Sequence, residues 1–176
     1  WAGTPPNVDT EATKYFMEEM CAEAGVRILY GAHASEVSMS GDRIDAVFVE
    51  TKSGRVAMKT NFVIDCSGDG DVLAWTGEDF IEYKNHISAM YRIGNVRNRT
   101  SGSHTPNEGV YTMHLGQGIS NVDGLNAYVA SKAQLELRKR MWEKTLDVRS
   151  KEGNENAYLL STPSIVGVRV TRVLNA

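Results

Sequence analysis

The segment Ile64–Asp71, which reads IDCSGDGD, holds the residues whose types and spacing most clearly point to chemistry. Two glycines alternate with aspartates there, directly after an apolar run. Glycine lacks a Cβ, so its backbone can adopt positive φ and a bound group can approach the main chain closely. We predict a short buried strand over 62–64, a tight turn over 67–70 and a helix from 71. In that order, backbone N–H groups at the helix start can face an anion.

The acidic residues of this segment limit which group the turn could hold. Asp65, Asp69 and Asp71 would repel an anion that they faced directly. We expect them instead to cap the helix or to accept hydrogen bonds from sugar hydroxyls. No metal is predicted, because hard cations need more converging oxygen ligands than these three offer. The alternative interpretation of the segment is a purely structural strand-to-helix turn.

Histidines are the second group of residues that could do chemistry, and none stands at metal-ligand spacing from another. His104 falls in a polar loop, and His114 falls on a predicted strand. Either could act as a base, because histidine titrates near neutral pH, and His114 is the catalytic candidate that we favour. Structural or solvent-facing roles are the alternative for all four histidines, which are His33, His86, His104 and His114.

Arginines flank the same polar loop, which spans Arg97–Gly109. Arg92, Arg97 and Arg99 could hold an acidic substrate, and solvated side chains are the alternative. A loop of this length in a compact domain is usually either functional or poorly ordered. The loop is therefore a candidate binding region.

The elements that must position these residues begin with a punctuated helix, which Asp9 or Thr10 can cap and Gly25 can end. A run of alternating strands separated by turn residues follows, which is typical of an antiparallel meander. The predicted order is a helix over 10–24, a strand over 26–30, meander strands over 34–40, 43–50 and 55–59, and a non-alternating buried strand over 62–65.

The second half of the chain is predicted to contain further strands and one long helix. Two apolar stripes run along this helix. One consists of Tyr128, Leu135 and Trp142, and the other of Val129, Ala133, Leu137 and Met141. The predicted elements are strands over 79–83, 87–96 and 109–116, the helix over 123–151 and a largely extended end over 157–176. Helices and strands mixed in this way predict an α/β (mixed α+β) fold.

Composition argues against several classes of function. The 176 residues are 41% hydrophobic and 23% charged, as in an ordinary globular protein, and 19 basic against 22 acidic residues give a net charge of −3. We therefore expect no nucleic-acid partner, and no membrane span because no apolar run approaches about 20 residues. Cys21 and Cys66 fall in predicted buried elements, which favours free thiols and a cytoplasmic setting.

Two motifs and the order of the elements give the chain a resemblance to a known family. The segment IDCSGDGD is similar to IDATGDGD, and GVRVTR at Gly167–Arg172 is similar to a later GxRxxR segment. Placed after a helix, a strand and a three-strand meander, they resemble the FAD-dependent oxidoreductases of the type with two dinucleotide-binding domains. The resemblance covers nearly the whole chain. Two departures are that Val170 stands where the family often has an acidic residue and that the N-terminal GxGxxG turn is lacking.

The resemblance implies a division of the chain into cofactor-binding and substrate-facing parts. Residues 1–80 would be the C-terminal half of the FAD-binding domain, 81–160 part of a substrate domain, and 161–176 a segment that returns toward the flavin. Because the chain starts at Trp1 and lacks GxGxxG, we expect an internal piece of a longer protein. The missing N-terminal segment of that protein would then be its partner.

The resemblance also implies roles for individual residues. FAD would lie against the glycine turn and against the backbone of Glu36 and Val37, which would meet the adenine. Arg169 would place positive charge near the flavin or its substrate. The implied cofactor-binding residues are Glu36, Val37, Ser67, Gly68, Asp69, Gly70, Asp71 and Arg172, and the catalytic candidates are Arg169 and His114.

These observations favour part of an FAD-dependent oxidoreductase that transfers two electrons, as a hydride from a small-molecule donor to the flavin. We expect the chain by itself to bind FAD weakly or not at all and to be inactive. The alternative is a non-catalytic α/β module that binds a ligand or partner through the 94–109 loop. A nucleotide-binding enzyme of another type would need a Lys, Ser or Thr partner beside the glycines, where SGDGDV offers acids.

Overall fold

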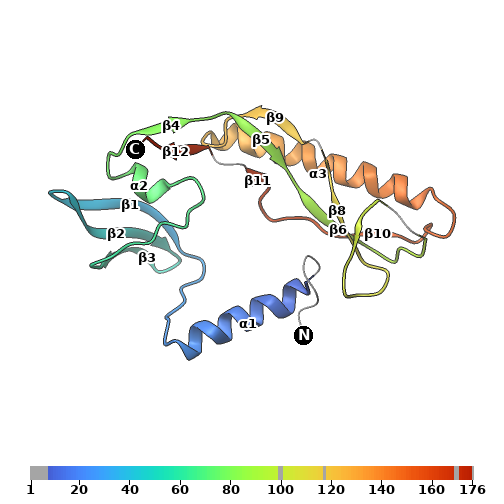
Figure 1. Cartoon of the computed structure of the whole chain (residues 1–176), viewed down its shortest axis with the longest axis horizontal. Coiled ribbons are helices and arrows are strands. Elements are labelled where there is room, and N and C mark those ends of the chain that lie inside the picture. Colours follow the sequence, from blue (N-terminus) through green and yellow to red (C-terminus); the bar gives the residue numbers. More distant parts are fainter. Residues whose placement is uncertain (1–7, 99–100, 117, 169–170, 176) are drawn as a thin grey trace. The chain divides into compact units, whose positions relative to one another are not determined.

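Every pairing of strands in the described part of the chain is antiparallel. The computed structural model describes residues 8–98, 101–116, 118–168 and 171–175, and the chain divides into two units (Figure 1). The meander unit combines Arg27–Tyr83 with Val170–Ala176, and the helix unit combines Trp1–Val26 with Lys84–Arg169. The mixed α/β fold with a three-strand meander and one long helix is as predicted. Whether the two units act as FAD-binding and substrate domains stays a prediction.

The meander unit is built on the sheet that the alternating pattern predicts, in the order β1-β2-β3. The buried apolar side chains of this sheet are Val37, Ala46 and Val49. The elements of this unit are β1 (His33–Ser40), β2 (Arg43–Thr51), β3 (Gly54–Lys59), the short helix α2 (Asp71–Ala74), β4 (Phe80–Glu82) and β12 (Arg172–Leu174). Strands β4 and β12 pair with each other, so the last described residues return to the segment that follows α2.

Two predicted strands of this region, over 26–30 and over 62–65, are wrong. Both segments are irregular in the structure, and their apolar side chains face solvent except for the half-buried Val63. Phe62 is 90% exposed and Ile64 is 88% exposed. A strand exists only where a neighbouring strand satisfies its backbone groups, and no described segment pairs with either run. Their apolar composition is that of buried strands, but the pairing partners are not in the described chain.

The helix unit contains two separate sheets and the two long helices. Its elements are α1 (Thr10–Glu23), β5 (Asn85–Ser88), β6 (Met90–Gly94), β7 (Ser103–His104), β8 (Tyr111–His114), β9 (Ile119–Val122), α3 (Ala127–Arg149), β10 (Tyr158–Ser161) and β11 (Gly167–Val168). One sheet has the order β10-β6-β8-β7, and the other has the order β11-β5-β9. The single strand predicted over 87–96 is therefore two strands that break at Ala89 and enter different sheets. Strand β9 was not predicted.

The core of the helix unit forms where α3 covers these sheets. Leu137 and Met141 of α3 are almost fully buried, together with Ile87 and Ile93 of the sheets. Of the two predicted stripes, the one that contains Leu137 provides the contact, whereas Tyr128, Leu135 and Trp142 remain exposed. The helix begins after Asn126, whose side chain accepts hydrogen bonds from the N–H groups of Tyr128 and Val129.

Helix α1 has the predicted ends but no buried residue. Asp9 caps it, and Gly25 follows it with a φ of 70°. Its apolar face stays exposed, with Phe16 and Met20 open to solvent. An apolar helix face without cover is consistent with a surface that another element would pack against.

The expectation that both cysteines are buried is wrong in part. Cys66 is exposed in the irregular segment before the turn, whereas Cys21 is half-buried, and both are free thiols.

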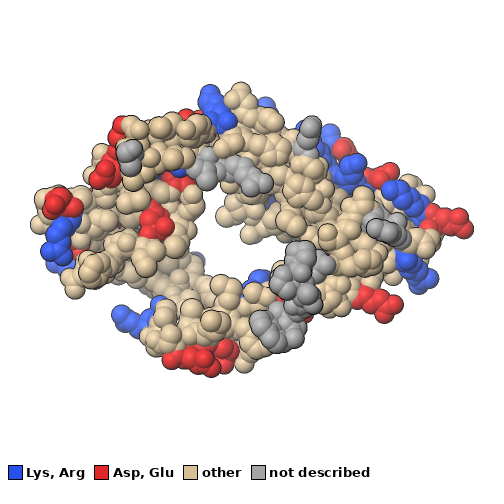
Figure 2. All heavy atoms as spheres, in the orientation of Figure 1, with Lys and Arg blue, Asp and Glu red and all other residues tan. Residues whose placement is uncertain are grey.

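On the face of the molecule that Figure 2 shows, the charged side chains of the described residues do not gather into a patch of one sign. Along α3, basic and acidic residues alternate in the view of Figure 2, with ion pairs such as Arg140–Glu136. None of the helices in the described residues has the length and apolar character that crossing a membrane requires.

Candidate functional site

The glycine turn at 67–70 is held by hydrogen bonds from its own neighbourhood. Asp65 accepts bonds from the backbone N–H of Ser67 at 2.9 Å and of Leu73 at 3.1 Å. The Ser67 hydroxyl oxygen accepts one from the N–H of Asp71 at 2.8 Å. Asp65 therefore caps α2 from the irregular segment before the turn, as expected for one of the aspartates. The turn is closed by the side chain of Asp65, which precedes it, and by that of its own first residue, Ser67.

The other two aspartates bind a segment about 100 residues further along the chain. Asp69 accepts a hydrogen bond from the N–H of Thr171 at 2.9 Å, and Asp71 accepts one from the Arg172 guanidinium at 2.8 Å. The backbone of Thr171 in turn accepts a bond from Tyr83 at 2.8 Å. The IDCSGDGD segment and the end of the GVRVTR segment thus lie side by side within the meander unit. The sequence held no signal for Thr171, because its contribution is a backbone N–H.

The backbone of the turn stays open at its first glycine. Gly68 has a φ of 96° and Gly70 a φ of 66°, conformations that residues with a Cβ adopt at a cost. A Cβ added at Gly68 would meet no heavy atom within 4 Å, whereas one at Gly70 would lie 3.5 Å from the Phe80 ring. The main chain at Gly68 is therefore accessible to a bound group, which is what a cofactor-facing turn requires.

The hydrogen bonds to Asp65 also set its protonation. Partial burial alone would raise the pKa of this carboxyl, but the hydrogen bonds from Ser67 and from the backbone of Leu73 and Val72 lower it below its usual value. Asp65 is therefore a carboxylate over the whole neutral range and acts as a fixed acceptor in the turn.

The residues predicted to meet adenine lie on β1 and have structural partners. The Glu36 carboxylate pairs with Arg55, whose guanidinium lies 4.5 Å from the centre of the Phe48 ring. Val37 is buried. Strand β1 carries an irregularity between Ala34 and Glu36, where its register with β2 shifts. A bulge of this kind changes which backbone groups are free, and contact through the backbone at this point stays a prediction.

Of the two catalytic candidates, the structure describes only His114. Arg169 lies outside the described residues. His114 is exposed at the end of β8, and its Nδ1 accepts a hydrogen bond from the N–H of Gly116 at 3.0 Å. A neutral ring that accepts through Nδ1 carries its proton on Nε2, so the free nitrogen is a donor. His114 would have to give up this bond before Nδ1 could act as a base, and its catalytic role stays a prediction.

Of the other histidines, His104 has a side-chain partner. Its Nε2 lies 2.9 Å from the hydroxyl of the buried Tyr111. In the described part of the chain, no group of three or more His, Cys, Asp or Glu side chains is arranged to hold a metal ion.

The sequence matches the model of a known protein family. A model described as FAD dependent oxidoreductase matches residues 1–101, which is more than half of the chain. The chain belongs to the FAD dependent oxidoreductase family. This match covers the meander and the glycine turn, and it confirms the resemblance that the sequence carries. A search of curated proteins found no significant match.

A solved structure supports the fold of this FAD dependent oxidoreductase family member. The chain is similar to the crystal structure of CabE, an aromatic hydroxylase from angucycline biosynthesis, with a TM-score of 0.59 at 17% sequence identity. The match covers 94% of this chain and 34% of CabE, so the chain spans about a third of the length of that protein. At this identity the likeness shows the fold alone.

Proposed function

We propose that this chain is part of an FAD-dependent oxidoreductase that transfers two electrons, as a hydride, from a small-molecule donor to the flavin. The observation that carries the proposal is that hydrogen bonds from Thr171 and Arg172 join that segment to Asp69 and Asp71 of the glycine turn. The backbone at Gly68 beside these contacts is open, and the chain belongs to this family. FAD, when bound, supplies the electron-accepting chemistry. The protein's own task is to place the donor and to set the charge around it.

The residues that would hold the cofactor do so mainly through the main chain. The backbone N–H groups of Gly68, Asp69 and Gly70 lie in a turn with two positive-φ glycines, whereas those of Ser67 and Asp71 already donate hydrogen bonds within the turn. Asp71 pairs with the Arg172 guanidinium, and Asp69 accepts a hydrogen bond from the Thr171 N–H. This arrangement reduces the expected repulsion of a phosphate, because the Arg172 cation compensates Asp71 and the Asp69 carboxylate is directed to the backbone of Thr171. Arg169 would add positive charge from the adjoining segment.

We further propose that the chain alone binds FAD weakly, because its cofactor site is incomplete. The cavity beside α2 has a volume of about 310 Å³, at the low end of the range for small-molecule sites. Phe62 and Val63, which belong to the apolar run that forms no strand, line it, and no residue of the turn at 67–70 does. A preceding segment with a strand and a GxGxxG turn would pair with this run and supply the pyrophosphate site.

Fluorescence titration with FAD tests this proposal on the chain and on the longer product of its parent gene. The longer protein is expected to bind FAD stoichiometrically, and the chain at least tenfold more weakly. Stoichiometric flavin in the purified chain would refute the composite site. A parent gene that encodes no GxGxxG upstream, and a product that binds no FAD, would refute the oxidoreductase.

A matched pair of glycine substitutions separates contact with the cofactor from backbone strain. Gly68 and Gly54 have φ values of 96° and 107°, and a Cβ on either meets nothing within 4 Å. Gly68→Ala and Gly54→Ala should therefore cost similar stability. We expect only Gly68→Ala to weaken FAD binding by the longer protein, and equal affinity of the two variants would remove the turn from the cofactor site.

A further inference from the structure

A second cavity, of about 670 Å³, lies entirely within the helix unit. It is bounded by the start of α1 and by one face of the β10-β6-β8-β7 sheet. Its volume is well within the range for small organic ligands. No residue of the glycine turn lines it.

Four polar side chains form one row across the sheet wall of this cavity. Arg92 of β6 lies opposite Ser161 of β10 and opposite Thr112 of β8, and Thr112 lies opposite Ser103 of β7. Residues directly opposite each other in neighbouring strands present their side chains to the same face. All four line the cavity. The next row along the strands turns to the other face, where Ile93 and Tyr111 belong to the core.

An irregularity in β10 keeps this row polar. Leu159 pairs with Ile93, but the next pair joins Ser161 to Arg92, so Leu160 is an extra residue on β10. In a regular ladder Leu160 would lie opposite Arg92. The bulge replaces an apolar neighbour of the guanidinium with a hydroxyl, and bulges are common beside functional sites.

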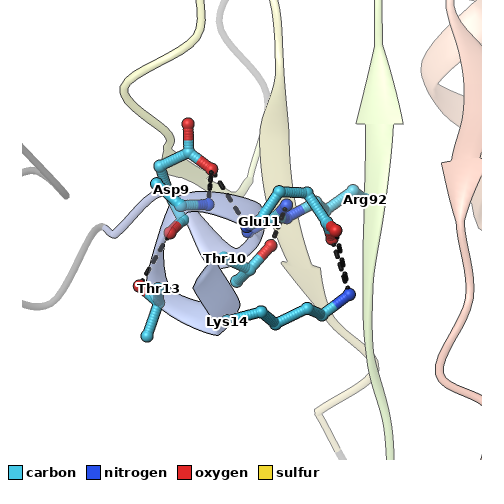
Figure 3. A network of polar contacts seen from close by, with 7 residues as sticks. Asp9, Thr10, Glu11, Thr13, Lys14 and Arg92 are labelled. Carbon is cyan, nitrogen blue, oxygen red and sulfur yellow. Dashed lines mark hydrogen bonds and ion pairs between the residues drawn. The ribbon is translucent and has the colours of Figure 1, made fainter. Parts of the chain in front are cut away.

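Arg92 carries the positive charge of this wall, and its partner is neutral. The half-buried guanidinium donates a hydrogen bond of 2.7 Å to the Thr10 hydroxyl, as Figure 3 shows. Among the described residues, no acidic side chain forms an ion pair with Arg92. Lys14 and Glu11, which also line the cavity, pair with each other at 2.8 Å, and both side chains are exposed.

The start of α1 is not a competing anion site. Asp9 already accepts hydrogen bonds from the N–H groups of Glu11 and Ala12 (Figure 3). The Thr10 hydroxyl accepts from Arg92 and can still donate its own proton. A group bound in the cavity would thus meet one uncompensated guanidinium and a set of hydroxyl donors, which is a suitable environment for a carboxylate.

We propose that this cavity binds a small organic acid, whose carboxylate is held by Arg92 and by the hydroxyls of Thr10 and Thr112. Val8, Met90 and Pro163 provide the apolar part of the wall for the body of the molecule. That this acid is the electron donor of the oxidoreductase rests on the proposed function. The binding itself does not require flavin.

Titrations of the purified chain with benzoate and with benzamide, followed by ¹H–¹⁵N NMR, test the proposal. The two probes share their shape, and only benzoate carries the charge that Arg92 would pair with. Benzoate is expected to shift the backbone amides of Thr10, Arg92 and Thr112 in a saturable way, and benzamide is not. Equal shifts with both probes, or shifts that map elsewhere, would overturn the proposal.

Variants identify the group that binds the probe. Arg92→Gln should weaken benzoate binding at least tenfold, and Arg92→Lys should weaken it less, because lysine keeps the charge but not the planar fork. Arg138→Gln, on the exposed side of α3, changes the net charge equally and should leave binding unchanged. If Arg92→Gln does not fold, Thr112→Val decides, since it keeps the side-chain shape; unchanged benzoate affinity in that variant would sink the proposal.

The two proposals fail in different ways. FAD titration of the longer protein reports only on the glycine turn, and benzoate binding reports only on the cavity. Benzoate binding without FAD binding would leave an organic-acid site on a protein that is not an oxidoreductase. FAD binding without benzoate binding would keep the oxidoreductase and remove the acid as its substrate.

Discussion

Asp71 and Arg172 form the ion pair that joins the two motif segments of this protein. The Arg172 side chain is 19% exposed and that of Asp71 is 37% exposed, so the pair is only partly screened by water. We expect Asp71→Asn to lower the free energy of unfolding by about 1 kcal/mol, because a half-buried guanidinium loses its carboxylate. Urea unfolding monitored by circular dichroism measures the change.

A double-mutant cycle with Arg172→Gln isolates the pair. The two substitutions together should cost less than the sum of each alone, with a coupling energy of about 0.5–1 kcal/mol. Asp42→Asn, in the exposed turn after β1, serves as the control and should change little. Strict additivity of Asp71→Asn and Arg172→Gln would mean that the two side chains do not interact in solution.

The lowered pKa of Asp65 leads to a prediction of how the stability of the meander unit changes with pH. Its folded-state pKa is lowered from the ordinary value of 3.8, since hydrogen bonds from Ser67 and Leu73 outweigh partial burial. A carboxyl of this kind stabilises the fold fully at pH values above its unfolded-state pKa, and this contribution is lost as the pH falls through the folded-state pKa.

We therefore expect the stability difference between the natural protein and the Asp65→Asn variant to be constant at neutral pH and to shrink below about pH 4. Unfolding in urea at pH 7, 5 and 3 provides the measurement. The same comparison for Asp45→Asn, on the exposed side of β2, controls for net charge. A difference that grows as the pH falls would contradict the assigned direction of the pKa shift.

At the scale of single residues, the sequence predicted local conformation better than it predicted which residues contact each other. Alternating glycine and aspartate in IDCSGDGD predicted a tight turn with positive φ, and Gly68 and Gly70 confirm it. The turn follows from local sterics, which sequence spacing reports. Asp69 binds the N–H of Thr171, which is 102 residues away and has no side-chain signature. Only the three-dimensional fold could assign that contact.

At the scale of elements, α3 offers a direct comparison of a buried and an exposed leucine. Leu137 is 0% exposed within the core, and Leu135, two residues earlier, is 67% exposed. We expect Leu137→Ala to lower the free energy of unfolding by about 2–5 kcal/mol, because it leaves a cavity. Leu135→Ala should change it by less than about 0.5 kcal/mol. Thermal unfolding of the two variants, which differ from the natural protein by the same atoms, provides the test.

Equal losses for Leu135→Ala and Leu137→Ala would show that α3 buries both stripes in solution, which another chain or copy would have to cover. The sequence alone could not choose between the stripes, since both have helical spacing and comparable hydrophobicity. What decides is the sheet surface that α3 packs against, formed by Ile87, Ile93 and their neighbours. Periodicity thus predicts the existence of a helix and its apolar faces but not which face is covered.

The break at Ala89 is a second case in which the element differs from its pattern. The run ISAMYRIGNV has strand-forming composition throughout, which predicted one strand. The structure divides it into β5 and β6, which pair in different sheets. Strand propensity is a property of short windows, whereas the choice of sheet depends on partners such as β8 and β9 that follow later in the chain.

At the scale of the whole molecule, the two failed strand predictions belong together. The runs 26–30 and 62–65 flank the meander, and each has the apolar composition of a strand buried on both faces. Neither pairs with a described segment, and Ile28, Phe62 and Ile64 are exposed. Because buried strands of this kind occur in parallel sheets, the pattern predicts a sheet whose other strands come from outside the described chain. The prediction of strands failed because it assumed that every partner was present.

Hydrogen exchange provides the final prediction. In the chain alone, the amides of Arg27–Leu29 and of Val63 and Ile64 should exchange within seconds, since no described group accepts their hydrogen bonds. In the longer product of the parent gene, these amides should become protected by orders of magnitude, because a neighbouring strand would pair with them. Amides of β2, which is paired on both sides, should be protected in both proteins and serve as the internal control. Protection of the two runs in the chain alone would mean that they find partners without any further segment. Lack of protection in the longer protein would remove the parallel sheet, and with it the physical reason for a composite FAD site.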